Sequence, residues 1–220
     1  MKYEWKKQEK ELYGAKKSPA LVTVPAQNYI MINGKGNPND IDFSNRVSAL
    51  YSLAYAIKMA YKATAAQNEL HDFAVYPLEG IWQKAEETEL IKENLEYTIM
   101  IRQPDFICEE MVKAALEQVK IKKPNPLFEE VRFGTMQDGK CVEILHIGAF
   151  DDEPISFEKM EQAGYQFDST WFNKQELEIR APYKVGDMWE FPLHIMDGYI
   201  CHQGKLEQGL QDTFAAIRKA

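Results

Sequence analysis

The sequence lacks several features that define large classes of protein, and cysteine is the first of them. Cys108, Cys141 and Cys201 are an odd number of thiols at wide spacing, which favours reduced cysteines over a disulfide framework. No apolar run approaches the roughly 20 residues that cross a membrane. The charged beginning of the chain also lacks the apolar stretch of a signal peptide. A cytoplasmic protein without a membrane partner is predicted.

An excess of positive charge is also missing. The 26 Lys and Arg residues are outnumbered by 34 Asp and Glu residues, which gives a net charge of −8. Proteins that bind nucleic acids present a basic face to the phosphates, so no nucleic-acid partner is expected. The 220 residues, 45% of them hydrophobic, are enough to bury a core without disulfide or metal cross-links.

Motifs of the common cofactor enzymes and hydrolases are absent too. The sequence contains no P-loop, no G-x-G-x-x-G fingerprint and no G-x-S-x-G nucleophile elbow, so no cofactor is predicted. His194, Asp197, Cys201 and His202 form a cluster in the sequence, but their spacing matches neither zinc fingers nor metalloproteases. We therefore predict no metal site.

Two segments have the pattern of amphipathic helices. In residues 40–63 the apolar side chains recur at steps of three and four residues, with Asp40 or Asp42 as the N-cap. The core positions of this helix are Phe43, Val47, Leu50, Ala54, Ile57 and Tyr61. A second helix is predicted over residues 104–123, with Asp105 as its N-cap.

Strands are predicted between and around these helices. Residues 20–38, 72–82 and 95–104 are rich in β-branched and aromatic residues and are bounded by Gly, Pro or charged connections. In the third strand Tyr97 and Ile99 alternate with polar or mixed positions, which indicates one core face. Residues 131–150 contain a central Asp138-Gly139 pair, which is typical of a hairpin turn.

An internal repeat connects the two halves of the chain. Residues 29–47 and 141–160 share the order of a strand, a glycine, an acidic loop with proline, and a Phe near the start of a helix. The pattern predicts an α+β fold of two β-α-β-β modules, with an antiparallel sheet and helices on one face. A duplicated sheet of this kind leaves a central groove between its halves for a small ligand.

A set of ordered motifs resembles the GyrI-like small-molecule-binding family over residues 1–162. The motifs are GKGNP, ALYSLAYAIKM, VYPLEGIW, YTIMIRQPDF, KKPNPL and LHIGAFDDEP. The resemblance implies a tandem fold shared with the effector-binding domains of multidrug-responsive activators, and a cleft for planar, often cationic molecules. Some members of the family look like hydrolases that open the cyclopropane ring of DNA-alkylating natural products.

Residues 163–220 depart from this family pattern. The family's closing strand, whose glutamate faces the cleft, is not found there. We treat residues 1–162 as the ligand-binding domain and residues 163–220 as a segment of open role, with completion of the sheet as one possibility.

Glu79 is the candidate catalytic residue. It stands among aromatic residues in the stretch FAVYPLEGIWQ, where a carboxylate is costly unless it is solvated, paired or able to hold a proton. It could bind an organic cation together with Tyr76 and Trp82, or deprotonate a water molecule that attacks a strained ring. The alternative is a charge at a strand end that points to water.

Strand alternation opposes this grouping, because it places Glu79 on the other face from Tyr76 and Trp82. Pro77 and Gly80 would permit a bulge that brings the three together. A bulge in this strand is therefore a condition of the stacking hypothesis.

Six further residues are candidate ligand contacts, and for three of them, Met100, Arg102 and His146, a structural role is the alternative. The two methionines could adapt to flat ligands, the arginine could instead lie at a strand edge, and the histidine could instead be a hydrogen-bonded core residue. The six are Tyr29, Met31, Met100, Arg102, His146 and Phe150.

Together these observations predict a binder of a small organic ligand, and they leave the oligomeric state open. The first hypothesis adds Glu-assisted hydrolysis of a cyclopropane-containing toxin to binding. The second is a non-catalytic module that sequesters drugs or senses an effector.

Overall fold

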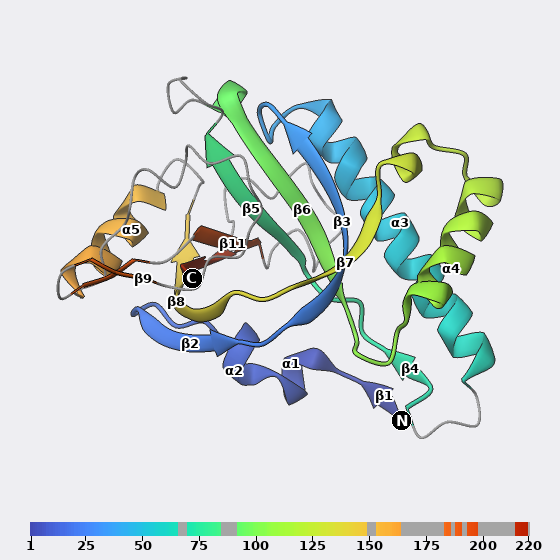
Figure 1. Cartoon of the computed structure of the whole chain (residues 1–220), viewed down its shortest axis with the longest axis horizontal. Helices are drawn as coiled ribbons and strands as arrows, with labels where there is room; N and C mark the ends of the chain where they lie inside the picture. Colours follow the sequence, from blue (N-terminus) through green and yellow to red (C-terminus); the bar gives the residue numbers. More distant parts are fainter. Residues whose placement is uncertain are drawn as a thin grey trace.

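The structure of the protein is a computed structural model. It describes residues 1–65, 70–84, 92–148 and 153–163, and the backbone of four short strands at 183–185, 188–190, 193–197 and 214–219. Strands and helices of these parts form a layered α+β architecture (Figure 1).

The centre of the molecule is an eight-stranded sheet in which all pairs are antiparallel. Its strand order is β2-β8-β12-β11-β5-β6-β3-β7. The eight strands are β2 (Ala20–Val24), β3 (Gln27–Lys35), β5 (Leu78–Lys84), β6 (Leu95–Gln103), β7 (Arg132–Met136), β8 (Gly139–Ile147), β11 (Leu193–Asp197) and β12 (Phe214–Lys219). The two-residue strands β1 (Lys2–Tyr3) and β4 (Asp72–Phe73) pair separately, as do β9 (Tyr183–Val185) and β10 (Met188–Glu190).

Six of the eight strands belong to two β-α-β-β modules that meet at β5 and β11, and β2 and β7 add to the two edges of the sheet. The first module runs β3, helix α3 (Ile41–Thr64), β5 and β6, and the second runs β8, helix α5 (Glu153–Gln162), β11 and β12. Read outward from the junction, the first half has the order β5-β6-β3 and the second has β11-β12-β8. The internal repeat in the sequence therefore predicted the module plan correctly.

Helices cover one face of the sheet, which we call the helix face. Helix α3 packs against α4 (Glu109–Lys122), and both lie over the first module, while α5 lies at the far end beside β8 (Figure 1). Two 3₁₀ helices, Lys92–Asn94 and Pro126–Glu129, complete this part of the chain. None of the helices in the described ranges is long and apolar enough to cross a membrane.

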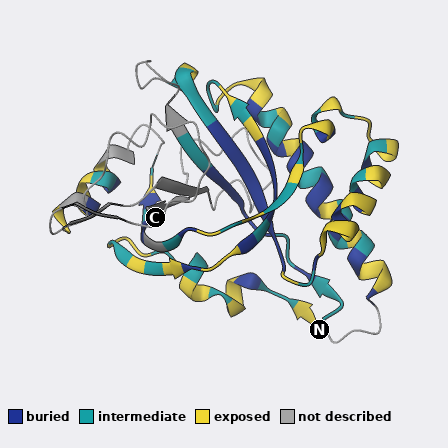
Figure 2. Cartoon of the chain, viewed as in Figure 1, coloured by how far each residue is buried: buried dark blue, intermediate teal, exposed yellow. Residues whose placement is uncertain are grey.

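The largest hydrophobic core fills the space between α3, α4 and the helix face. All six apolar positions predicted for the long helix are buried there. From the sheet, Ile30, Ile32, Ile99 and Ile101 project into the same core. Strand β3 is buried over residues 29–32 and β6 over residues 97–103, and Figure 2 shows these central parts in dark blue. Apolar periodicity thus identified the element that covers the sheet.

The opposite face, which we call the site face, is covered near β5 by residues 1–14, the N-terminal segment. This segment contains β1 and two four-residue helices, α1 (Trp5–Gln8) and α2 (Lys10–Tyr13). It starts beside the helix layer, where Tyr3 packs edge-on to Phe106 at a centroid distance of 6.1 Å. It ends on the site face, where Leu12 packs with Val22 and Val24 of β2.

Two local predictions were wrong. Helix α4 begins at Glu109 with Cys108 as its N-cap, and Asp105 is instead an exposed residue 3.8 Å from Arg102. The Asp138-Gly139 turn does not form a hairpin, although Gly139 has the expected positive φ of 70°. Strand β7 pairs with β3, and β8 pairs with β2 and β12, because pairing with distant strands outweighs the local turn signal.

Gly34 provides a test of the packing on the helix face. A Cβ at this position would lie 2.3 Å from the ring of Tyr97, which packs edge-on to Phe43 at 5.2 Å. We expect Gly34→Ala to displace that ring and lower the free energy of unfolding by about 1–3 kcal/mol in urea titrations. In Gly134→Ala the new Cβ meets Met31 at an ordinary 3.5 Å, so a change below about 0.5 kcal/mol is expected. Equal losses in the two variants would contradict this packing.

Candidate functional site

Glu79 is the second residue of β5 and lies on the site face, with an exposed fraction of 0%. Its two oxygens each accept a hydrogen bond from a tyrosine. Tyr13 of α2 donates to Oε1 at 3.1 Å, and Tyr29 of β3 donates to Oε2 at 3.1 Å. Hydrogen bonds of this kind offset part of the cost of burying a carboxylate. Glu79 is therefore a buried carboxylate that two tyrosine hydroxyls hold in place.

Flexible apolar side chains surround this carboxylate. In the sheet register Glu79 lies beside Met100 of β6, which in turn lies beside Met31 of β3. The two methionines and Tyr29 form a buried cluster on the site face, with Ile81 packed against it. Methionine side chains adapt to ligands of irregular shape. The surroundings of the carboxylate are therefore apolar and flexible.

Gln27 extends the hydrogen-bond chain from Glu79. Tyr29 Oη also donates to Gln27 Oε1 at 2.7 Å, while Gln27 Nε2 has no partner among the described residues. If the amide rotates by half a turn, Nε2 donates to Tyr29 Oη, and the hydroxyl proton is then used entirely for Glu79. Gln27 is thus placed to control how strongly Tyr29 binds the carboxylate.

A second buried carboxylate, Glu9, lies next to this group. Its Oε1 accepts hydrogen bonds of 2.5 Å from both Tyr3 and Tyr76, and its Oε2 forms an ion pair with Arg102 of β6. The guanidinium also stacks over the Tyr76 ring at 4.9 Å. Glu79 and Glu9 with their partners Tyr13, Tyr29, Tyr76 and Arg102 form what we call the tyrosine–carboxylate site.

Burial and charge set the protonation of this site. Burial raises the pKa of Tyr76, and Glu9 raises it further against the opposing effect of Arg102. Burial by itself lowers the pKa of Arg102, but Tyr13, Tyr76 and Glu9 together hold it above its ordinary value. At neutral pH Tyr76 is therefore a hydroxyl donor and Arg102 is a cation.

Five of the residues predicted from sequence are brought together with Glu79 or its neighbours. Tyr29, Met31, Met100 and Arg102 share the site face. Tyr76 lies in the loop before β5 and reaches the site through its contacts with Tyr13, at a centroid distance of 5.7 Å, and with Arg102.

Trp82 is not brought to the site. Strand β5 pairs with β6 continuously from Leu78 to Lys84, so the bulge that would turn Trp82 towards Glu79 is not present in this strand. Trp82 points to the helix face, where its ring lies 5.0 Å from that of Tyr97. Simple alternation, which opposed the stacking hypothesis, describes this strand correctly.

His146 also lies on the other side of the sheet. It is buried beneath α5, and its Nδ1 is 2.9 Å from Ser156 Oγ, which is the core arrangement considered as its alternative. Phe150 falls outside the described residues, as do the side chains of His194, Asp197, Cys201 and His202. Within the parts of the chain that are described, no cluster of three potential metal ligands occurs.

Sequence reasoning missed Glu9 and the role of Tyr13. Both lie in four-residue helices or between them, which are too short to show an apolar period. The available signal was the aromatic content of the N-terminal segment. Trp5 is buried, stacks on Tyr76 at 5.8 Å and donates from Nε1 to the carbonyl of Val75 at 3.0 Å. Its burial fixes the segment beside the site.

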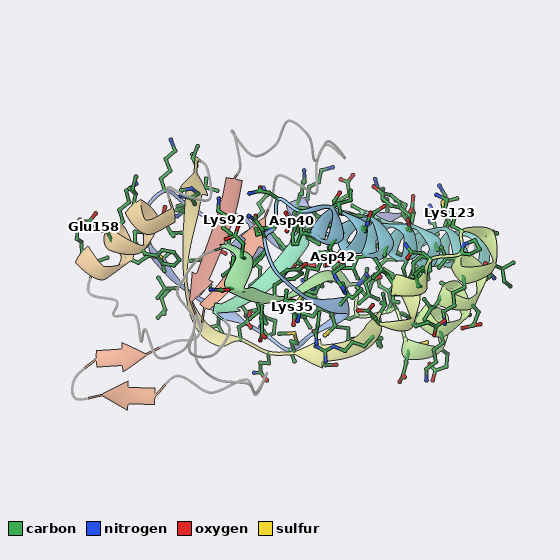
Figure 3. The ribbon with its side chains drawn as sticks, turned by 90° about the horizontal axis from the view of Figure 1, so that it is seen from above. Lys35, Asp40, Asp42, Lys92, Lys123 and Glu158 are labelled. Carbon is green, nitrogen blue, oxygen red and sulfur yellow. The ribbon has the colours of Figure 1, made fainter. Side chains whose placement is uncertain are left out.

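The outer surface carries a different type of charge pair. In Figure 3 this outer surface extends from Glu158 on α5, at one end of the molecule, to Lys123, just after α4, at the other end. Pairs on this surface, such as Lys113 with Glu109 at 2.7 Å, are between well-exposed side chains. They contrast with Arg102 and Glu9, whose side chains are only 7% and 11% exposed.

This contrast gives a stability prediction. Arg102→Met leaves Glu9 buried without its cation and should lower the free energy of unfolding by about 3–5 kcal/mol. Adding Glu9→Met should recover a large part of that loss, because no unpaired charge remains. Lys113→Met is the control, and because its pair with Glu109 is exposed to solvent it should leave the free energy of unfolding almost unchanged. Equal effects of Arg102→Met and Lys113→Met in denaturant titrations would refute the buried pair.

Comparisons with known proteins agree with this geometry. A crystal structure of an uncharacterized conserved protein from Listeria innocua is 26% identical, with a TM-score of 0.76, and the match covers 99% of this chain and 98% of that one. A crystal structure of a hydrolase from Listeria innocua is also 26% identical, with a TM-score of 0.74 and the same coverage. No curated protein matches the chain. The sequence pattern of the GyrI-like small molecule binding domain matches residues 17–184, and the chain belongs to this family.

Proposed function

We propose that the protein binds planar organic molecules, cationic ones above others, on the site face next to Glu79. The observation that supports this most strongly is the fully buried carboxylate of Glu79, held in place by two tyrosine hydroxyls. A buried charge costs several kcal/mol of stability, and such positions are concentrated at functional sites. An organic cation would form an ion pair with this carboxylate and offset that cost.

The neighbours of Glu79 support the shape of the proposed ligand. Met31, Met100 and Ile81 supply flexible apolar side chains that could adapt to flat rings. Tyr13 and Tyr76 add aromatic faces at the side of the N-terminal segment, and such faces attract cations. Membership of a small-molecule-binding family is consistent with this arrangement.

Hydrolysis is the second candidate function, and the similarity to a Listeria protein described as a hydrolase favours it. Glu79 would take a proton from a water molecule whose oxygen attacks a carbon of a cyclopropane ring. The broken C–C bond would release its electron pair into the electron-withdrawing group conjugated to the ring, which then takes up a proton.

A charge-removing substitution tests the binding proposal. Glu79→Gln keeps the size of the side chain but removes its charge, so the affinity for the cationic dye rhodamine 123 should fall at least about tenfold. Fluorescence anisotropy titrations measure this directly. Glu110→Gln, an equal change of charge on the exposed start of α4, should leave the affinity unchanged. Equal affinities of wild type and Glu79→Gln would place the binding site elsewhere.

The catalytic proposal needs a separate assay. Incubation with a cyclopropane-containing alkylator should produce the water adduct of the opened ring, detected by mass spectrometry. In the proposed mechanism Glu79 takes the proton from the attacking water, so we expect Glu79→Gln to abolish this product. Product formation that survives the substitution would remove Glu79 from the mechanism. Binding of the alkylator without any product would leave the sequestering or sensing module as the function.

A further inference from the structure

The N-terminal segment precedes the part of the chain that matches the family, which starts at residue 17. It is nevertheless built into the fold. Strand β1 pairs in parallel with β4, with Lys2 beside Asp72 and Tyr3 beside Phe73. Together with the hydrogen bond from Trp5 to Val75, this pairing fixes the segment against the loop that leads into β5. Its side chains therefore have defined positions at the site.

Glu9 is the charged residue of this segment that reaches furthest into the structure. Its carboxylate has three donors, the hydroxyls of Tyr3 and Tyr76 and the guanidinium of Arg102. The three donors come from β1, the loop before β5, and β6. Donors from both the N-terminal segment and the sheet thus hold the carboxylate of Glu9 against the guanidinium of Arg102.

Arg102 without Glu9 would change the electrostatics at Glu79. Glu79 lies beside Met100 in the register, so Arg102, two residues further along β6, is its diagonal neighbour on the same face. Diagonal neighbours have side chains roughly 7–8 Å apart. Without Glu9 the guanidinium would keep only Asp105, an exposed carboxylate 3.8 Å away, as an acidic partner. It would then oppose the effect of Glu79 on a bound ligand, and would itself attract a carboxylate or phosphate.

We propose that Glu9 is a specificity-determining residue, which makes the site select cationic over anionic ligands by neutralising Arg102. This rests on the proposed function, in that the ligand binds next to Glu79. The formal charges of Arg102, Glu79 and Glu9 are +1, −1 and −1, so the three groups carry −1 together. Without Glu9 they would carry zero. The charge preference is therefore supplied by a residue outside the family-matched part of the chain.

Two xanthene dyes of similar size and opposite charge, rhodamine 123 and fluorescein, provide the probes. The measured quantity is the affinity for rhodamine 123 divided by the affinity for fluorescein, both determined on the whole chain. In Glu9→Gln the affinity for rhodamine 123 should fall and that for fluorescein should rise, which lowers the ratio by about tenfold or more. Glu11→Gln makes the same change of charge on an exposed turn of α2, and solvent screening should leave the ratio unchanged.

A double variant separates charge from fold. Glu9→Gln combined with Arg102→Gln returns the three positions to a total of −1 and leaves no unpaired cation. The ratio should return towards the wild-type value, which a purely structural role of Glu9 does not predict. If Glu9→Gln folds poorly, the double variant can be compared with Arg102→Gln instead. These two proteins differ only at Glu9, and its removal should again lower the ratio.

Each outcome decides between the two proposals. An unchanged ratio in Glu9→Gln, while rhodamine binding still depends on Glu79, overturns the role of Glu9 and leaves the proposed function standing. A lowered ratio that the double variant does not restore also overturns it. Rhodamine binding that is absent, or unaffected by Glu79→Gln, overturns the proposed function and the role of Glu9 with it.

Discussion

Burial of the Glu79 carboxylate is the constraint on which the rest of this structure depends. A carboxylate at the centre of a sheet must be hydrogen-bonded, and the donors here come from two separate parts of the chain. Tyr29 comes from β3, which lies beyond β6 in the same module, and Tyr13 comes from the N-terminal segment. The segment must therefore be fixed in position, and the Glu9–Arg102 ion pair and the burial of Trp5 achieve this.

The two faces of the sheet consequently have different roles. The helix face carries the apolar core under α3 and α4, where strand side chains and helix side chains interdigitate. The site face concentrates tyrosine, methionine and charged residues in the same three strands. Stability thus depends mainly on one side of β3, β5 and β6, and we propose that the ligand is recognised on the other. The alternation of a β-strand allows both to coexist.

Sequence patterns predicted those parts of the fold that have a local cause. The apolar period of residues 40–63 gave helix α3, and alternation in residues 95–104 gave β6 and the direction of Arg102. The failures involve long-range pairing. The turn at Asp138-Gly139 joins strands that pair elsewhere, and Tyr13 contacts Glu79 across 66 residues of sequence. The residues close to Asp138-Gly139 and to Tyr13 in the sequence do not indicate which distant strand or side chain each of them contacts. The stacking hypothesis for Trp82 required a bulge in β5. Gly80 would permit such a bulge but does not enforce it, and the strand pairs with β6 without one.

A crystal structure of the complex with rhodamine 123 tests the central claim most directly. We expect the dye to lie on the site face against Met31 and Met100, with a cationic nitrogen within about 4 Å of the Glu79 carboxylate. A dye bound on the outer surface of α3 or α4, with the hydrogen bonds from Tyr13 and Tyr29 to Glu79 unchanged, would contradict the claim.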